Sequence, residues 1–442
     1  MIISARQLSL ALCSGALAYS PLVVGVVPIS PAAILFGLLF AFSLYAFSPL
    51  AKSGKPKKFV LVAISICAAI TLCDLMARVV IYSLWDDRPS ALSAHRWPPL
   101  PQTYRFNANI RYSGLTYGNL SAVAMKRDWR EYRRINFITD VYGFRNVPVE
   151  PGASQPPPEL IMLGDSFCVG DGTGQEQIWS SLYSGGYGMR VYNLCMDGAG
   201  PWQEYVNLLV ESERLRLGEG TTILWVMFSG NDLDDFYHPA LEKSQLPWLG
   251  PLERLLYSMK EFRYRSPLRR LLLLGSTGVS GEKVLERKFI DGRRVLFADS
   301  HARVRSLTLE DVKRHPNFAS LTATIAAMKR FADEKRAEVL VVLAPSKEEV
   351  YSWVLDGAAP WSSEVAPSAF SVALQEICVR NGIRYFDLKP SMIAASRRVY
   401  EESGEMLWWR DDTHWNGLGH KEAAASVFNA LLLPRVRRIS SP

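Results

Sequence analysis

Short apolar runs that alternate with helical patterns determine the fold class of the second half of the chain. Each run has the length of a strand, whereas the segments between them repeat apolar residues at helical spacing. The strand-like runs are Leu160–Leu163, 190–192, Thr222–Phe228, 337–343 and 383–388, and the helical patterns include Phe318–Glu334, 368–381 and 420–433. This alternation predicts an α/β fold, with three α/β/α layers built around a parallel sheet.

The start of the chain has a different character, because apolar residues dominate it. Three stretches, 8–27, 32–50 and 59–85, are each near the ~20 residues that cross a bilayer as a helix. They predict three N-terminal transmembrane helices. The loop 52–58 carries four lysines and no acidic residue, and positive loops stay on the cytoplasmic side. We therefore expect an inner or plasma membrane protein whose globular domain is extracytoplasmic, in the periplasm.

Residues 1–18 have an alternative interpretation as a cleaved signal peptide, which leaves the topology of the other two spans unchanged. The expected organisation is a membrane anchor at 1–85, a packed connector at 86–158, an α/β domain at 159–434 with an insertion at about 237–315, and a basic tail at 435–442. The formal net charge of +7 comes partly from the lysine loop and this tail. Basic and aromatic residues do not interleave as in nucleic-acid readers, so we expect no nucleic-acid partner.

A serine follows the first strand-like run, in the sequence Gly164-Asp165-Ser166. Glycine and aspartate suit a tight turn between a strand and a helix. A serine at such a turn is either the N-cap of the helix or a nucleophile, and the second role requires a base and a carboxylate. The residues after Ser166 exclude the G-x-S-x-G pattern of the α/β-hydrolases.

Near the end of the chain, His414 follows two acidic residues, Asp411 and Asp412. An imidazole can take the proton of a serine hydroxyl when a carboxylate holds the ring in the required tautomer. Ser166 and His414, with one of these aspartates, therefore form a candidate catalytic triad. Either aspartate is close enough along the chain to reach the ring.

Two further loops follow strand-like runs. Gly198 and Gly200 lie in the loop after 190–192, and Asn231 lies in the turn after Thr222–Phe228. The carboxyl ends of parallel strands meet at one edge of a sheet. The amide of Ser166, the amide of Gly198 or alternatively Gly200, and the Asn231 side chain are thus candidate donors to an oxyanion.

These four segments together resemble the SGNH (GDSL-type) hydrolase superfamily. Gly164-Asp165-Ser166 matches its first block, Gly198 its second, Gly230-Asn231-Asp232 its third, and the Asp-His pair its fifth. The resemblance covers roughly residues 159–433, with the motifs in the order of the family. It implies an α/β/α fold and acyl-ester chemistry with a serine nucleophile, without a cofactor.

Other motifs resemble a membrane-anchored branch related to alginate O-acetyltransferase-like envelope enzymes. They are residues 141–146, residues 345–351 and the sequence His414-Trp415-Asn416. The common family spacing Asp-x-x-His would select Asp411, whereas this branch more often has Asp-x-His, which favours Asp412. The resemblance implies an acylated glycan or lipid as substrate, most simply an acetyl ester. With only three spans, a transferase of this kind needs a partner membrane protein that supplies the acyl group.

The alternative function is a non-catalytic scaffold that binds polysaccharide in an envelope assembly machine. The presence of Ser166, Asn231 and His414 together argues against it. No Cys or His spacing typical of a metal site occurs, so no metal is expected. Cys168 and Cys195 follow two strand ends; we expect two buried thiols, with a disulfide in an oxidising compartment as the alternative.

Overall fold

The computed structural model describes residues 95–97, 100–124, 126–148, 156–234, 283–289, 291–363 and 365–433. All of them belong to one compact unit, formed by Arg88–Glu242 and Lys283–Pro442. The three expected spans, the basic tail and most of the expected insertion lie outside the described residues. Within the described ranges, no helix combines the length and the apolar character that crossing a membrane requires.

A five-stranded sheet forms the centre of the unit, and its strands run in parallel in the order β11-β10-β7-β5-β6. The strands are β5 (Leu160–Leu163), β6 (Val191–Asn193), β7 (Thr222–Phe228), β10 (Glu338–Ala344) and β11 (Arg384–Asp387). Every residue of β5 and β7 is buried, which explains why these strands are continuously apolar instead of alternating. The parallel α/β sheet expected from the alternation is therefore confirmed.

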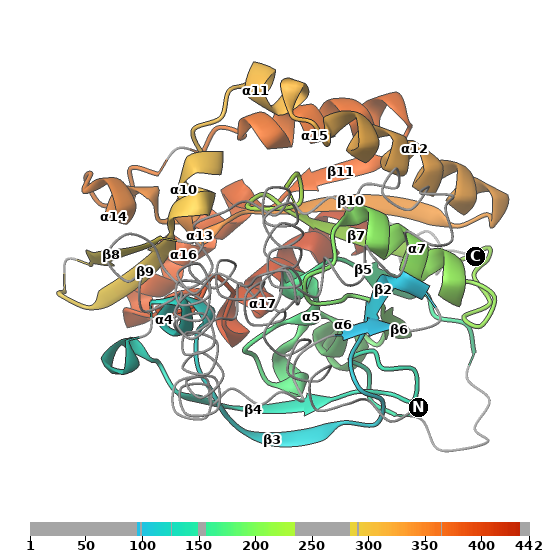
Figure 1. Cartoon of the computed structure of the whole chain (residues 1–442), viewed down its shortest axis with the longest axis horizontal. Helices are drawn as coiled ribbons and strands as arrows, with labels where there is room; N and C mark the ends of the chain where they lie inside the picture. The colour runs from blue at the N-terminus through green and yellow to red at the C-terminus, as the bar shows by residue number, and fades with distance from the viewer. Residues whose placement is uncertain are drawn as a thin grey trace, which may run out of the picture. The chain divides into compact units, whose positions relative to one another are not determined.

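Helices cover both faces of this sheet (Figure 1). One layer contains α7 (Pro201–Glu211), α12 (Phe318–Glu334) and α15 (Ala369–Arg380), with the short α11 (Leu309–Arg314) against α15. The other layer contains α6 (Trp179–Tyr187), α16 (Lys389–Ser403) and α17 (Gly417–Val427), which continues as the π-helix η5 (Phe428–Leu432). Apolar faces on both sides of a parallel sheet require this three-layer arrangement.

Several elements differ from the sequence-based expectation. Helix α12 has the expected bounds, but α16 was not expected at all. The final helix begins three residues earlier than position 420, because the Asn416 side chain accepts a hydrogen bond from the Gly419 amide (3.0 Å) and caps it. The described part of the expected insertion, residues 283–289 and 291–315, forms an antiparallel hairpin and two helices. These are β8 (Val284–Lys288), β9 (Arg294–Ala298), α10 (Asp299–Val304) and α11.

The described residues before the α/β domain form small antiparallel pairs and short helices that pack against it. They comprise two antiparallel pairs and two short helices, namely β1 (His95–Trp97) with β2 (Leu100–Arg105), β3 (Arg111–Thr116) with β4 (Arg133–Ile138), α4 (Asn119–Val123) and η2 (Arg127–Trp129). Arg105 donates to Asn207 (2.5 Å) and Glu211 (3.1 Å) on α7. Buried side-chain contacts of this kind join the segment to the α/β layers.

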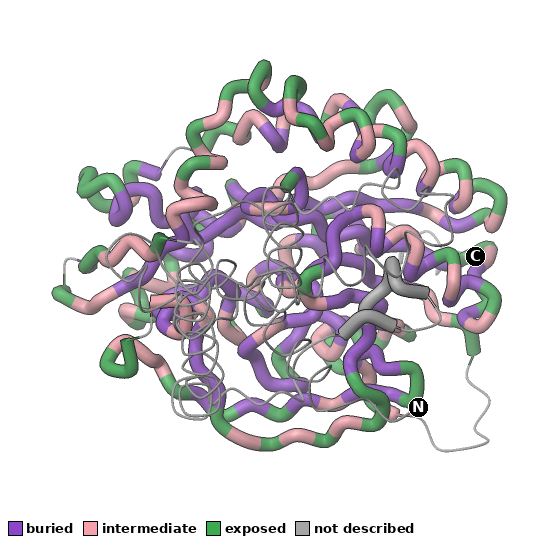
Figure 2. The backbone as a smooth tube through the Cα atoms, in the orientation of Figure 1, coloured by how far each residue is buried: buried purple, intermediate pink, exposed green. Residues whose placement is uncertain are grey.

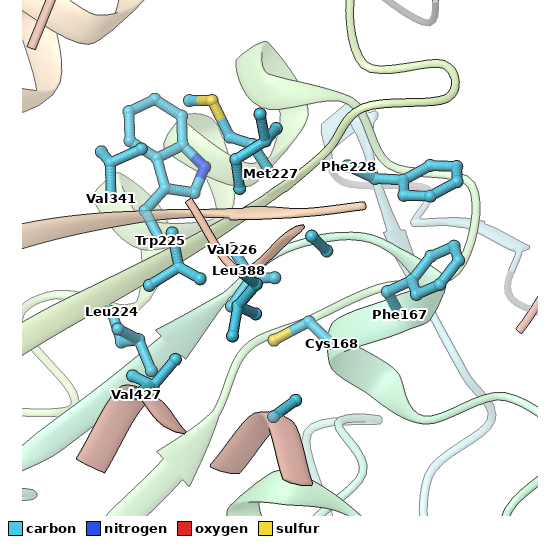
Figure 3. Packing of buried hydrophobic residues seen from close by; sticks show 14 of the residues in the cluster. Phe167, Cys168, Leu224, Trp225, Val226, Met227, Phe228, Val341, Leu388 and Val427 are labelled. Atoms are coloured by element: carbon cyan, nitrogen blue, oxygen red, sulfur yellow. The ribbon is translucent and has the colours of Figure 1, made fainter. Parts of the chain in front are cut away.

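Burial is concentrated on the sheet and on the loops at its carboxyl edge, where the tube in Figure 2 is mostly purple. Aromatic rings fill this end of the core. The rings of Phe167 and Phe228 stack with centroids 4.0 Å apart, and Figure 3 shows them side by side. Trp415 packs edge-on against Phe167 and stacks on Trp179. The loops that follow β5 and β7 are thereby held by apolar contacts beneath them.

Candidate active site

The turn after β5 presents Ser166. Gly164 occupies a position that excludes a side chain, because a Cβ there would lie 2.6 Å from Cys168 Cβ and 2.7 Å from the Val226 carbonyl oxygen. Asp165 caps the helix α5 (Ser166–Val169), accepting a hydrogen bond from the Phe167 amide (2.9 Å). The N-cap is therefore Asp165, and the interpretation of Ser166 as the cap is wrong. Its hydroxyl is left for another partner.

That partner is His414. Its Nε2 lies 2.8 Å from Ser166 Oγ, and its Nδ1 lies 2.8 Å from Asp412 Oδ1. The histidine is buried except for 7% of its surface, and Asp412 is almost entirely buried. A continuous chain of hydrogen bonds thus runs from the hydroxyl through the imidazole to a carboxylate, the arrangement that activates a serine.

Asp411 does not contact the imidazole. Its Oδ2 accepts hydrogen bonds from the Gly118 amide, the Ser121 hydroxyl and the Glu131 amide, each at 2.8 Å. Its backbone carbonyl accepts from the start of α4 as well. Asp411 is only 1% exposed, and its side chain and backbone bind the connector. Of the two adjacent aspartates, only Asp412 therefore contacts the imidazole.

Arg133 on β4 joins both carboxylates. One guanidinium nitrogen lies 3.0 Å from Asp411 Oδ1, and another forms an ion pair with Asp412 Oδ2. The Arg133 Nε donates to the Gly172 carbonyl (3.1 Å), and the guanidinium lies over the Trp409 ring. Removing one member of a buried ion cluster leaves an uncompensated charge. Loss of Arg133 would therefore leave Asp411 and Asp412 buried without this cation.

These charges shift the titration of the triad. Burial favours the neutral form of Asp412, but His414 and Arg133 outweigh it and hold the pKa of Asp412 well below its usual range. Burial also disfavours a charged His414, yet the Asp412 carboxylate, helped by Asp171 and Asp197, raises the pKa of His414 to about 9. Burial raises the pKa of Asp411 despite the Arg133 charge. The imidazole is thus a strong base in this site.

The candidate oxyanion loops lie at the same edge of the sheet as Ser166, because β6 and β7 flank β5. The Met196 amide donates to the Gly164 carbonyl (2.9 Å), which joins the loop after β6 to the nucleophile turn. The Gly200 amide is occupied by the Gln203 side chain (2.8 Å), whereas Gly198, at φ 68°, donates no hydrogen bond among the described residues. This difference favours Gly198 over Gly200 as a donor.

Asn231 lies in the turn after β7, which two buried carboxylates hold. Asp232 accepts a hydrogen bond from the Phe228 amide (2.7 Å) and closes the turn. Glu349 accepts from the Ser229 hydroxyl and from the Ser346 amide (2.9 Å). The turn carrying Asn231 is thereby connected to α13 (Lys347–Val350) at the end of β10.

A disulfide joins Cys168 on α5 to Cys195 in the loop after β6. The expectation of two buried thiols is wrong. Because β5 and β6 are neighbours, their carboxyl ends bring the two cysteines together, with Cα atoms 5.5 Å apart. Cys378 is the free cysteine of the described residues, and burial raises the pKa of its thiol to about 12.

Three consecutive charged residues after β10 are buried and contact three different loops of the site. Lys347 donates to the carbonyls of Asp412 and Trp409, Glu348 accepts from the Ala298 amide (2.7 Å), and Glu349 holds Ser229. Burial lowers the pKa of Lys347 to about 8, although the neighbouring carboxylates act in the opposite direction. The motif at 345–351 is therefore a junction between the histidine loop, β9 and the oxyanion loop.

Arg145, from the motif at 141–146, is completely buried and bonded mainly to carbonyl groups. It donates to the carbonyls of Val169 (3.1 Å), Gly170 (2.7 Å) and Thr173 (2.6 Å), and to the Gln175 side chain (3.1 Å). Burial lowers its pKa to about 10. The guanidinium fixes the loop after the nucleophile helix, between α5 and η3 (Gln175–Gln177).

The roles of Arg133, Arg145 and the charged residues of α13 were not assigned from the sequence. Arg145 and the charged residues of α13 lie in the motifs at 141–146 and 345–351, where charged residues stand among apolar ones. Arg133 carries no such signal, since it is one of several arginines in 127–134. Among the described residues, no group of three or more His, Cys, Asp or Glu side chains is arranged to hold a metal ion.

A cleft of about 940 Å³ runs along the edge strand β6 and is separate from the triad. Its lining includes Tyr142, Ser180, Tyr192 and Arg214, and none of Ser166, Asp412 or His414. The hydrogen-bonded groups, and not this cleft, therefore locate the candidate chemistry.

No family model matches the chain, and no curated protein matches it. Among solved structures, it is similar to the psychrotrophic esterase EstA from Pseudoalteromonas sp., at 10% identity and a TM-score of 0.32, over 62% of this chain and 96% of that chain. It is also similar to a member of the lipolytic G-D-S-L family from Veillonella parvula, at 11% identity and a TM-score of 0.32, over 62% of this chain and 97% of that chain. For an acetyl xylan esterase, the identity is 12% and the TM-score 0.31, over 62% of this chain and 99% of that chain.

Proposed function

We propose that the chain is an SGNH-type serine esterase or O-acyltransferase. The observation that carries the proposal is the hydrogen-bonded series Ser166 Oγ, His414, Asp412, with 2.8 Å at both links. A serine hydroxyl near neutral pH is a poor nucleophile until a base takes its proton. The two links supply the base and the group that orients it.

In the proposed reaction, His414 accepts the proton of Ser166 while Oγ attacks the carbonyl carbon of an ester. The amides of Ser166 and Gly198 and the Asn231 side chain are the proposed donors to the developing oxyanion. The protonated imidazole then donates its proton to the leaving oxygen, which leaves an acyl group on Ser166. The oxygen of water in a hydrolase, or of an acceptor hydroxyl in a transferase, then attacks the acyl carbon while His414 takes its proton. The imidazolium returns a proton to Ser166 Oγ as the bond between Oγ and the acyl carbon breaks, which frees the serine.

The proposed setting is the outer face of a plasma or inner membrane, with an acylated envelope glycan or lipid as substrate. The three apolar stretches and the lysine loop at 52–58 support it. A disulfide between Cys168 and Cys195 is compatible with an oxidising compartment. For a transferase, a partner membrane protein would supply the acyl group. A reporter fused after Pro442 should be active only outside the cytoplasm, and cytoplasmic activity would refute this setting.

A non-catalytic scaffold is the alternative, and covalent labelling separates the two functions. A fluorophosphonate reacts with a serine only when a base activates it. Purified protein should be labelled at Ser166, with Ser166→Ala as the unlabelled control and His414→Ala labelled far more slowly. Absence of labelling in the folded wild-type protein would support the scaffold.

A further inference from the structure

A second histidine faces a buried carboxylate beside the candidate site. His301 Nδ1 on α10 lies 3.6 Å from Glu348 Oε2 on α13. Glu348 is completely buried, and its other oxygen accepts the Ala298 amide at 2.7 Å. The carboxylate is therefore fixed from one side and directed at the imidazole from the other.

The position of the His301 ring relates it to the oxyanion loop. Its ring packs edge-on against Phe228, with centroids 5.2 Å apart, and its Cδ2 lies 3.0 Å from where a Cβ of Gly230 would be. Gly230 immediately precedes Asn231. Phe228 in turn stacks on Phe167, which is next to Ser166 in sequence. His301 thus borders the candidate site on the Asn231 side.

The chemistry of the pair determines which ring nitrogen is available. Burial penalises the charge of Glu348, but the Lys347 ammonium and the Ala298 amide, which act whatever the protonation state of His301, favour the carboxylate and help to lower the pKa of Glu348. A carboxylate facing Nδ1 favours the tautomer that carries its proton there. The His301 Nδ1 and the Glu348 Oε2 are both buried and form no hydrogen bond with each other, while the His301 side chain retains 12% exposure. With the proton on Nδ1, the opposite nitrogen, Nε2, is a hydrogen-bond acceptor.

We propose that His301, oriented by Glu348, is a substrate-binding residue that accepts a hydrogen bond from a hydroxyl group adjacent to the reacting ester. This inference rests on the proposed function and narrows its substrate class to esters of polyhydroxylated molecules, that is, carbohydrates. A hydroxyl donor is the complement of an acceptor nitrogen held in one tautomer.

The test compares two acetyl esters in the full-length protein. An acetylated monosaccharide carries hydroxyls beside its ester, whereas 4-nitrophenyl acetate carries none. In His301→Phe, which retains ring packing on Phe228, the ratio of kcat/KM for the sugar ester to that for the aryl ester should fall about tenfold, the scale of one lost hydrogen bond. His301→Gln restores a polar group and should recover part of the ratio.

His315 provides a matched control, because its Nε2 also faces a carboxylate, Asp234, at 3.0 Å. His315→Phe should leave the ratio as in the wild type. An unchanged ratio in folded His301→Phe, or equal losses for both esters, would reduce the pair to a structural contact and overturn the inference. If instead the wild type cleaves neither ester and Ser166 resists the fluorophosphonate, the proposed function itself fails.

Discussion

The two halves of the candidate triad are held in place by different physical means. Ser166 follows a buried parallel strand, and backbone hydrogen bonds, a disulfide and stacked aromatic rings fix its turn. His414 and Asp412 lie on a loop that buried charges hold, with Arg133 on one side and Lys347 on the other. The nucleophile side therefore depends on the sheet, whereas the histidine side depends on electrostatic pairing with distant segments.

This difference predicts how each half of the triad responds to pH and to substitutions that remove a charge. Apolar burial and backbone hydrogen bonds change little with pH, so the turn at Ser166 should keep its geometry over a wide range. Buried ion pairs stabilise only while every member is present and charged. Substitutions that remove a charge should therefore damage the histidine side most.

Asp412→Asn should have the largest effect. The amide cannot hold the imidazole in the reactive tautomer, so kcat for an acetyl ester should fall by roughly 10³–10⁴. Asp411→Asn is the matched control, since Asp411 binds the connector and not the ring. Steady-state kinetics on both folded variants measure the difference, with a much smaller loss of kcat in Asp411→Asn. A reversed order would assign the triad acid to Asp411.

Arg133→Met tests the charge cluster itself. The substitution keeps an apolar stem but leaves Asp411 and Asp412 buried without their cation. Breaking a buried ion pair in this way costs about 3–5 kcal/mol, which urea denaturation would measure as a loss in the free energy of unfolding. Arg134→Met is the control, because Arg134 lies next in β4 and is exposed. Equal stability of the two variants would contradict the role of Arg133.

Replacing Cys168 and Cys195 together by serine tests the nucleophile side. The disulfide closes a loop of 27 residues, for which the chain-entropy model gives about 3.5 kcal/mol of stabilisation. We expect the free energy of unfolding to fall by this order, measured by denaturation under non-reducing conditions. Because the sheet still fixes Ser166, kcat of the folded variant should fall far less than in Asp412→Asn. A comparable loss of kcat would show that the sheet alone does not fix the turn.

The last prediction of this series concerns the dependence of kcat/KM on pH. His414 must be neutral to act as the base, and its pKa is raised to about 9. The rate should therefore rise tenfold per pH unit below about 9 and level off above it. An initial-rate profile with an aryl acetate measures this limb. A limb near ~6.5, the value of an unperturbed histidine, would mean that the carboxylates do not act on His414 as described.

As the pH rises, the free energy of unfolding should fall while kcat/KM increases. The folded-state pKa of His414 lies above its unfolded value, so the stabilisation by this ion pair is complete below about 6.5 and is lost as the pH rises through about 9. The pH that makes the base competent thus weakens the pairing that holds it.

The sequence predicted the parallel sheet and its helices better than the buried charges around His414 and Asp412. Apolar runs and helical periodicity are local, and they identified β5, β7 and α12 because burial dictates both patterns. The positions of Ser166, His414 and Asp412 followed from short motifs, and the structure brings these three together. From the sequence, the disulfide was only the alternative to two thiols, and the burial of Asp411 could not be predicted, because each depends on residues brought together only by the tertiary fold.

The link between Arg133 and Asp412 spans 279 positions of the chain, and it has a consequence for how the molecule is made and inherited. During synthesis, the β3–β4 hairpin leaves the ribosome long before its acidic partners exist, so the reactive centre closes only among the last steps of folding. For the same reason, recombination at the prolines near position 156 would join Asp411 and Asp412 to a different N-terminal segment that lacks Arg133. The β3–β4 hairpin and the parallel sheet must therefore be inherited as one unit.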